Sequence, residues 1–194
     1  SAEETRHALG FTSTRTSGLR SQFGTMGKPI HAGMASSNGV EAALLVSYGC
    51  VSRPDALECV EGFAATHVSA DTEEGAGFHP GAPFQFTDVK FKFHACCHGT
   101  HGPLEAILCA KPQVANALDD IVAVRLTVNP QWRNICCIAR PTTGLEVKFS
   151  LSTTLSMALL GVDTASPDSF TEALCVDPAI VALADKVVIN FDAA

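Results

Sequence analysis

The densest group of reactive side chains lies at residues 91–102, where one lysine, two cysteines and three histidines fall within ten residues. The segment begins with the alternation of a strand, breaks at Gly99 and continues into an apolar stretch typical of a helix. Lys92 could act as a base or as a cation that stabilises an enolate. His101 could carry a proton near neutral pH. The alternative is a structural lysine on a strand and a helix histidine bonded to backbone groups.

The same segment also raises the hypothesis of a zinc site, because thiols and imidazoles are the preferred ligands of zinc. Adjacent cysteines rarely ligate one zinc ion, and no second pair at a metal-binding spacing follows elsewhere. Thiols packed as small apolar groups are the preferred interpretation, and no metal is expected. The side chains considered for this site are His94, Cys96, Cys97, His98 and His101.

A second candidate group lies at residues 24–33, a glycine-rich turn that leads into a helix. Lys28 stands at the predicted start of that helix, with Thr25 three residues before it and His31 three residues after it. The N-terminus of a helix attracts anions, and a lysine beside it strengthens the field. These residues would therefore hold a substrate carboxylate. The alternative is an ordinary surface lysine at a helix start.

The first part of the chain must position Lys28. Residues 1–10 carry no strong pattern, and residues 11–21 read as a loop. Residues 30–48 predict a helix that is apolar nearly all round, and residues 56–65 predict a second one. A stretch rich in Gly and Pro, residues 68–83, reads as a linker or lid.

The second part must position Lys92 and His101, and its pattern mixes strands with helices. Predicted strands cover 84–95, 121–128, 135–138 and 186–191, and predicted helices cover 98–110, 148–160 and two further segments that start near 166 and 177. Carboxylates on these helices, Glu105 among them, lack an evident partner in the sequence and read as solvated.

The predicted fold class is α+β: a small sheet of two to four strands with helices on one face, preceded by a two-helix remnant of an all-α domain. We expect residues 1–83 to form a partial helical domain with its linker and residues 84–194 to form the α+β domain. Two helices do not make a core of their own.

Composition narrows the function classes. The 194 residues carry a net charge of −7 without a basic cluster, which argues against a nucleic-acid partner. Apolar runs are too short to span a bilayer, and no signal peptide is visible at residues 1–10, so no membrane is expected. Four of the eight cysteines form two pairs of neighbours in the sequence, at 96–97 and 136–137. This spacing suggests free thiols and a cytoplasmic protein.

Three segments, taken together and in order, resemble the MmgE/PrpD family. They are residues 24–33 (GTMGKPIHAG), residues 92–101 (KFHACCHGTH) followed by Glu105 and Ala106, and residues 141–150 (PTTGLEVKFS). The resemblance covers roughly residues 11–191. The family includes 2-methylcitrate dehydratase, cis-aconitate decarboxylase and iminodisuccinate epimerase, which act on small di- and tricarboxylates without a metal or an organic cofactor.

The resemblance implies a cofactor-independent lyase or isomerase that dehydrates, decarboxylates or epimerises its substrate through an enolate-like intermediate. Lysines aimed at the developing charge would lower the barrier, and a nearby histidine or lysine would carry the proton. By resemblance, the catalytic residues are Lys28, Lys92 and His101, and the substrate-binding residues are Thr25, His31 and Cys97.

The sequence also departs from the family pattern. Relatives are much longer, with a large helical domain mostly before the position numbered 1 here, so we expect a truncated chain. Many relatives carry a tyrosine shortly after the third segment, where this sequence has Ser152, Thr153 and Thr154. The alternative function is a catalytically inert homologue that acts as an oligomerising or partner-binding module. The expected protein partner is a second copy, in a homodimer or higher homo-oligomer, or a chain that supplies the missing helical domain.

Overall fold

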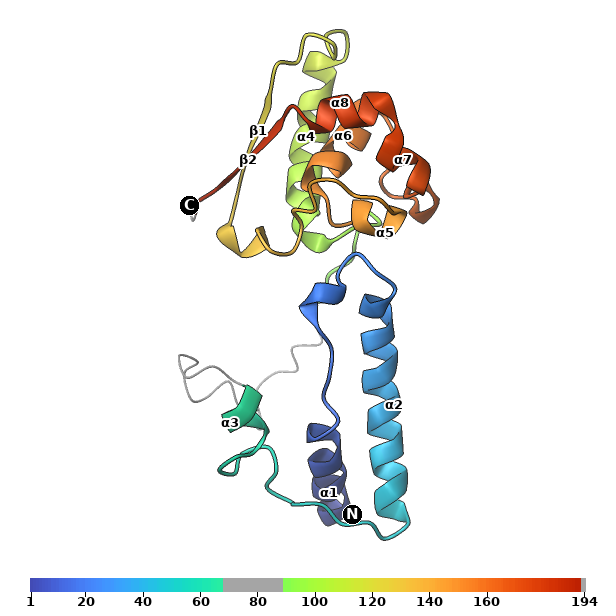
Figure 1. Ribbon diagram of the computed structural model, residues 1–194, viewed down its shortest axis with the longest axis vertical. Helices are drawn as coiled ribbons and strands as arrows, with labels where there is room; N and C mark the ends of the chain where they lie inside the picture. Colours follow the sequence, from blue (N-terminus) through green and yellow to red (C-terminus); the bar gives the residue numbers. More distant parts are fainter. Residues whose placement is uncertain (68–88, 193–194) are drawn as a thin grey trace. The chain divides into compact units, whose positions relative to one another are not determined.

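The computed structural model describes residues 1–67 and 89–192, and the chain divides into two compact units (Figure 1). The first unit comprises Ser1–Arg20 and Gly27–Val89, and the second comprises Ser21–Met26 and Lys90–Ala194. The linker predicted at residues 68–83 lies outside the described residues, and the predicted domain boundary stays a prediction.

The first unit is built on two helices that lie side by side, α1 at Ala2–Ser13 and α2 at Gly27–Ser47 (Figure 1). The Ser1 hydroxyl accepts a hydrogen bond from the Glu4 backbone N–H at 3.2 Å, so α1 begins with a capping box. Helix α2 ends shortly before Gly49, whose φ of +88° is a left-handed conformation that favours glycine. The helix predicted from residue 30 is present and starts three residues earlier.

Two predictions for this unit are wrong. Residues 2–13 form α1, where no element was predicted, because its signal is the cap at Ser1 and Glu4 rather than an apolar periodicity. The helix predicted at 56–65 is mostly turns, and only the short helix α3 at Phe63–His67 forms. Local turn bonds, such as that from the Phe63 N–H to the Ala56 carbonyl at 2.8 Å, replace a continuous helix there.

Helix α2 is largely exposed within its own unit. Only Ala42 and Val46 are buried among its residues. Polar contacts hold α2 to the segment after α1: the Asn38 amide donates to the Arg15 carbonyl at 2.9 Å, and Arg15 pairs with Glu41 at 2.5 Å. The large apolar side chains exposed on α2 are Ile30, Met34, Val40, Leu44 and Leu45.

The second unit combines helices with a two-stranded parallel sheet. Strands β1, Val124–Val128, and β2, Val187–Phe191, pair in register from Val124 opposite Val187 to Val128 opposite Phe191. The broad α+β class is confirmed, whereas helices on one face of the sheet stay a prediction. The helices of this unit are η3 (His98–Thr100), α4 (His101–Val114), η4 (Pro130–Trp132), α5 (Gly144–Val147), α6 (Leu151–Leu160), η5 (Pro167–Ser169), α7 (Glu172–Val176) and α8 (Pro178–Ala184).

Two of the four predicted strands are present, as β1 and β2. The other two predicted strands, at 84–95 and 135–138, are not confirmed. Residues 89–95 form no strand, and residues 84–88 lie outside the described part. Residues 135–138 make only an isolated antiparallel bridge, between Cys137 and Ser150. The helix predicted at 148–160 is present as α6 and starts three residues later, because the Ser150 hydroxyl accepts from the Thr153 N–H at 3.3 Å and caps the helix there.

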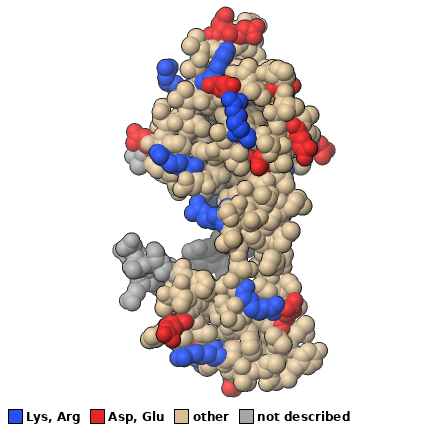
Figure 2. Space-filling model, viewed as in Figure 1, with Lys and Arg blue, Asp and Glu red and all other residues tan. Residues whose placement is uncertain are grey.

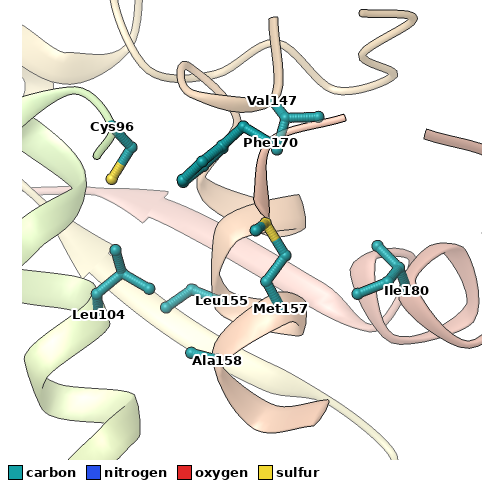
Figure 3. Packing of buried hydrophobic residues seen from close by; sticks show 8 residues of the cluster. All are labelled: Cys96, Leu104, Val147, Leu155, Met157, Ala158, Phe170 and Ile180. Carbon is teal, nitrogen blue, oxygen red and sulfur yellow. The ribbon is translucent and has the colours of Figure 1, made fainter. Parts of the chain in front are cut away.

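Helix α6 is the centre of the core, and nearly all its residues are buried. Leu104 of α4 and Ile180 of α8 pack with Leu155 and Met157 of α6 (Figure 3). The end of α6 is fixed as well, because the Lys111 ammonium donates to the Ala158 carbonyl at 2.9 Å. Helix α4, which begins with His101, is therefore anchored on α6 through Leu104 and Lys111.

A second cluster holds the turn before α4. Cys97, Cys136, Phe149 and Leu151 are buried in it, and Trp132 packs against it. The Trp132 ring lies on the backbone of Gly99, and a Cβ atom there would overlap the ring, with Trp132 Cδ2 only 2.7 Å away. Glycine is required at this position because no side chain fits under the indole.

Charge is sparse on the surface. Figure 2 shows Lys, Arg, Asp and Glu scattered among uncharged residues on the face drawn. Among the described residues, no helix combines the length and the apolar character needed to cross a membrane.

Replacing Gly99 by alanine should destabilise the protein by about 1–3 kcal/mol, because the new methyl group overpacks the site. Gly102→Ala is the matched control: its Cβ would meet nothing within 4 Å, and alanine in a helix gains up to about 1 kcal/mol over glycine. Urea unfolding followed by far-UV circular dichroism measures both. Equal stability of the two variants would show that the indole does not press on Gly99.

Candidate active site

Two of the predicted catalytic residues meet at the backbone of Cys96. The exposed Lys92 side chain turns back so that Nζ donates to the Cys96 carbonyl oxygen at 3.0 Å. The His101 ring also interacts with the backbone of Cys96. The structure therefore brings Lys92 and His101 to the backbone of one residue, four and five residues away along the chain.

His101 is the first residue of α4 and is only 8% exposed. Its Nε2 atom is buried and has no hydrogen-bond partner among the described residues. We therefore assign the interaction with the Cys96 backbone to Nδ1, with the ring hydrogen on that atom. A neutral imidazole protonated at Nδ1 carries its lone pair on Nε2, which makes this atom a proton acceptor.

The surroundings keep His101 neutral. Burial lowers the pKa of His101 below its ordinary value of 6.5, and electrostatic interactions with His94, His98 and Lys92 lower it further. The hydrogen bond to Cys96 opposes this shift. A histidine at the N-terminus of a helix is also disfavoured in its charged form. His101 is consequently a base at neutral pH.

His94 was not among the predicted catalytic or substrate-binding residues, yet it lies beside His101. The two ring centroids are 5.1 Å apart, with the planes at 80°, and His98 is 5.2 Å from His101 on the same measure. His94 is buried, its Nδ1 lies 2.7 Å from Thr164 Oγ1, and its Nε2 lies 2.9 Å from Glu105 Oε1. Glu105, which is predicted from the sequence to be solvated, thus has His94 as a hydrogen-bond partner.

The thiols of this segment are packed rather than exposed. Cys96 Sγ lies 2.9 Å from Thr100 Oγ1, and Cys97 Sγ lies 3.1 Å from Cys136 Sγ. Burial raises the pKa of Cys96, and a hydrogen bond with Cys97 followed by burial raises that of Cys136, so these thiols stay protonated. Cys97 as a substrate-binding residue stays a prediction.

The zinc hypothesis gains no support from the geometry. In residues 1–67 and 89–192, no group of three or more His, Cys, Asp and Glu side chains is arranged to hold a metal ion.

The other predicted site residues belong to different segments. Lys28 is the second residue of α2 and is half-buried, and the His31 ring packs on Gly18, where a Cβ would lie 3.3 Å from the ring. Both lie in the first unit, whereas Thr25, Lys92 and His101 lie in the second. Convergence of Lys28 and Lys92 on one cleft stays a prediction.

Thr25 makes local contacts. Its hydroxyl donates to the Gln22 carbonyl at 2.8 Å and lies 3.0 Å from Gln22 Oε1, next to the left-handed Gly24. This arrangement fixes the turn that precedes α2. Its role in binding substrate stays a prediction.

Comparison with known proteins finds one family across both units. The model of the MmgE/PrpD N-terminal domain matches residues 1–75, and the model of the MmgE/PrpD C-terminal domain matches residues 94–194. Both matches agree with the resemblance seen in the sequence motifs.

Three similar proteins are fungal. The cis-aconitate decarboxylase-like protein oryM of Aspergillus oryzae is 29% identical over 115 residues, which cover 55% of this chain and 24% of that protein. Two cis-aconitate decarboxylases of Aspergillus terreus are each 32% identical over 108 residues, which cover 52% of this chain and 22% of theirs. The matched stretch thus spans less than a quarter of the length of these curated relatives.

We expect the stability of the protein to fall as the pH drops through the ordinary histidine pKa of 6.5. The pKa of His101 is lower in the folded chain than in the unfolded one, so the unfolded state binds the proton first. The contribution of neutral His101 is present above this pH and is lost below it. Urea unfolding over the range from about pH 7.5 to 5.5 should show a smaller loss in His101→Gln than in the unchanged protein. An imidazole signal of His101 that titrates at or above 6.5 in NMR spectra would contradict this assignment.

Proposed function

Because the chain belongs to the MmgE/PrpD family, we propose that it forms part of an active site that removes a proton or a carboxyl group from a small di- or tricarboxylate. The observation that carries the proposal is the buried, unpartnered Nε2 of His101 beside the cationic Lys92. His101 is suited to accept a proton, and Lys92 is suited to stabilise negative charge.

The chemistry follows from these two roles. Loss of a proton next to a carboxylate leaves an electron pair that spreads into the carboxylate as an enolate-like anion. Lys92 stabilises this charge by exchanging the Cys96 carbonyl for a substrate oxygen. His101 takes the proton at Nε2. In a decarboxylation, the carbon–carbon bond breaks, carbon dioxide leaves, and a proton delivered to the remaining carbanion completes the product.

Among these reactions, decarboxylation of a tricarboxylate is the first choice. The similar fungal proteins are named for the decarboxylation of cis-aconitate. The matched stretch spans 22–24% of those proteins, so the remaining pocket residues come from a larger helical part, on the same polypeptide or on a partner chain. His31, Thr25 and Cys97 are the further substrate-binding candidates of this chain.

A second candidate function is an oligomerising module without activity. The observation that favours it is the apolar face of α2, on which Ile30 is 54% exposed and Leu44 is 50% exposed. Burial of apolar area is worth about 25 cal/mol per Å², so a helix with this surface is a strong association site. Such a module would bind a second copy or a chain that carries the rest of the helical domain.

Titration of the protein with cis-aconitate tests the carboxylate site. We expect Lys92→Ala to weaken binding about tenfold or more, because loss of one charge-assisted contact costs at least about 1.5 kcal/mol. Lys186→Ala is the matched control, since Lys186 reaches only the Asp119 carbonyl, at 3.5 Å. Isothermal titration calorimetry gives the affinities. Unchanged affinity in Lys92→Ala contradicts the site, and no binding by the unchanged protein contradicts a carboxylate site in this chain.

Sedimentation velocity at high protein concentration tests the second candidate. The unchanged protein should sediment as a dimer or larger, and Leu44→Glu should sediment as a monomer because it places a charge on the apolar face of α2. Leu19→Glu is the control, because Leu19 is 67% exposed and lies outside α2. A monomer at every concentration of the unchanged protein rules out association through this helix.

A further inference from the structure

We propose that His94 is a positioning residue for His101: held between Glu105 and Thr164, it keeps the His101 ring oriented so that Nε2 remains the proton acceptor. The inference rests on the proposed function for the identity of the proton that is accepted. The geometry of the three residues does not depend on it.

His94 connects three segments of the second unit. It precedes η3, Glu105 belongs to α4, and Thr164 follows the end of α6. The backbone is fixed at the same place, because the Ala95 N–H donates to the Thr164 carbonyl at 2.8 Å. With 6% of its surface exposed and both nitrogens in hydrogen bonds, the His94 ring has one orientation.

The hydrogen-bond partners of His94 decide which of its two nitrogens carries the hydrogen. A carboxylate can only accept, so His94 Nε2 carries the hydrogen that is donated to Glu105 Oε1. The Thr164 hydroxyl then donates to Nδ1 of the neutral ring. Both nitrogens are committed to the protein, so His94 cannot be the group that takes a proton from a substrate. His101 differs in having one nitrogen without a partner.

The contact between the two rings orients the His101 ring. The rings of His94 and His101 meet edge to face, which is the preferred arrangement of two π systems. His101 would otherwise be free to turn about its side-chain bonds and exchange the roles of its two nitrogens. The fixed His94 ring therefore limits the positions that the His101 ring can take.

The charges around His101 also favour its neutral form. Lys92, His94 and His98 face it with positive or potentially positive groups. Helix α6, which packs against α4, carries no ionisable residue. The Glu105 carboxylate is paired with His94 Nε2, and Asp163 and Lys111 line a cavity together with His94.

NMR correlation of the imidazole nitrogens and carbon-bound protons tests the inference without a substrate. In the unchanged protein, His101 should show one tautomer with unprotonated Nε2 and a nuclear Overhauser effect to the His94 ring. Glu105→Ala should lose both features, and Glu105→Gln should keep them because its amide oxygen still accepts from His94. Thr164→Val removes the second partner and should also mix the tautomers. Glu172→Ala, on the exposed surface of α7, is the control.

The outcomes separate this inference from the proposed function. A single His101 tautomer in both Glu105→Ala and Thr164→Val, with the ring-to-ring effect intact, overturns the positioning role. Mixed tautomers in these variants support it even when cis-aconitate does not bind. Dispersed amide signals from α6 in each variant show that the unit is folded, so a change at His101 is then local.

Discussion

The candidate active site depends on one acceptor, the backbone carbonyl oxygen of Cys96. A buried carbonyl must be hydrogen-bonded, and this one accepts from the Lys92 ammonium at 3.0 Å, with the His101 ring next to the backbone of the same residue. Its own position is set by the residues on either side: the Ala95 N–H is bonded to Thr164, and the Cys97 N–H is bonded to the Lys148 carbonyl at 2.9 Å. Lys92 and His101 are thus placed together by main-chain hydrogen bonds. These bonds involve no other reactive side chain.

Those main-chain bonds persist because α6 supplies a rigid support. Its buried hydroxyls do not disturb the core, since Thr154 donates to the Ser150 carbonyl at 2.8 Å and Ser156 donates to the Ser152 carbonyl at 2.9 Å. The helix can therefore be surrounded by Leu104, Phe170 and Ile180 on several sides. An element buried all round fixes both α4 and the turn before it, which is the requirement for a precise site.

Local patterns explain how much of this could be predicted from the sequence. The helices near 30–48 and 98–110 and the strands at β1 and β2 follow from apolar periodicity and turn residues. The alternation of Phe91 and Phe93 was misleading: both are 74% exposed, and the chain turns there so that Lys92 reaches Cys96. The motif predicted Lys92 and His101, but the bonds of His94 to Glu105 and to Thr164, 11 and 70 residues away, are tertiary contacts that no local spacing encodes.

The bond from Lys92 to Cys96 has a consequence for the proposed carboxylate site. In the absence of a ligand, the ammonium is already withdrawn from part of its hydration shell and directed at a neutral oxygen. In the proposed site, an incoming carboxylate would compete with an amide dipole for this cation and not with water alone. The amide oxygen would occupy the place of the substrate oxygen, so selectivity for full negative charge would arise from the exchange of one acceptor for a stronger one.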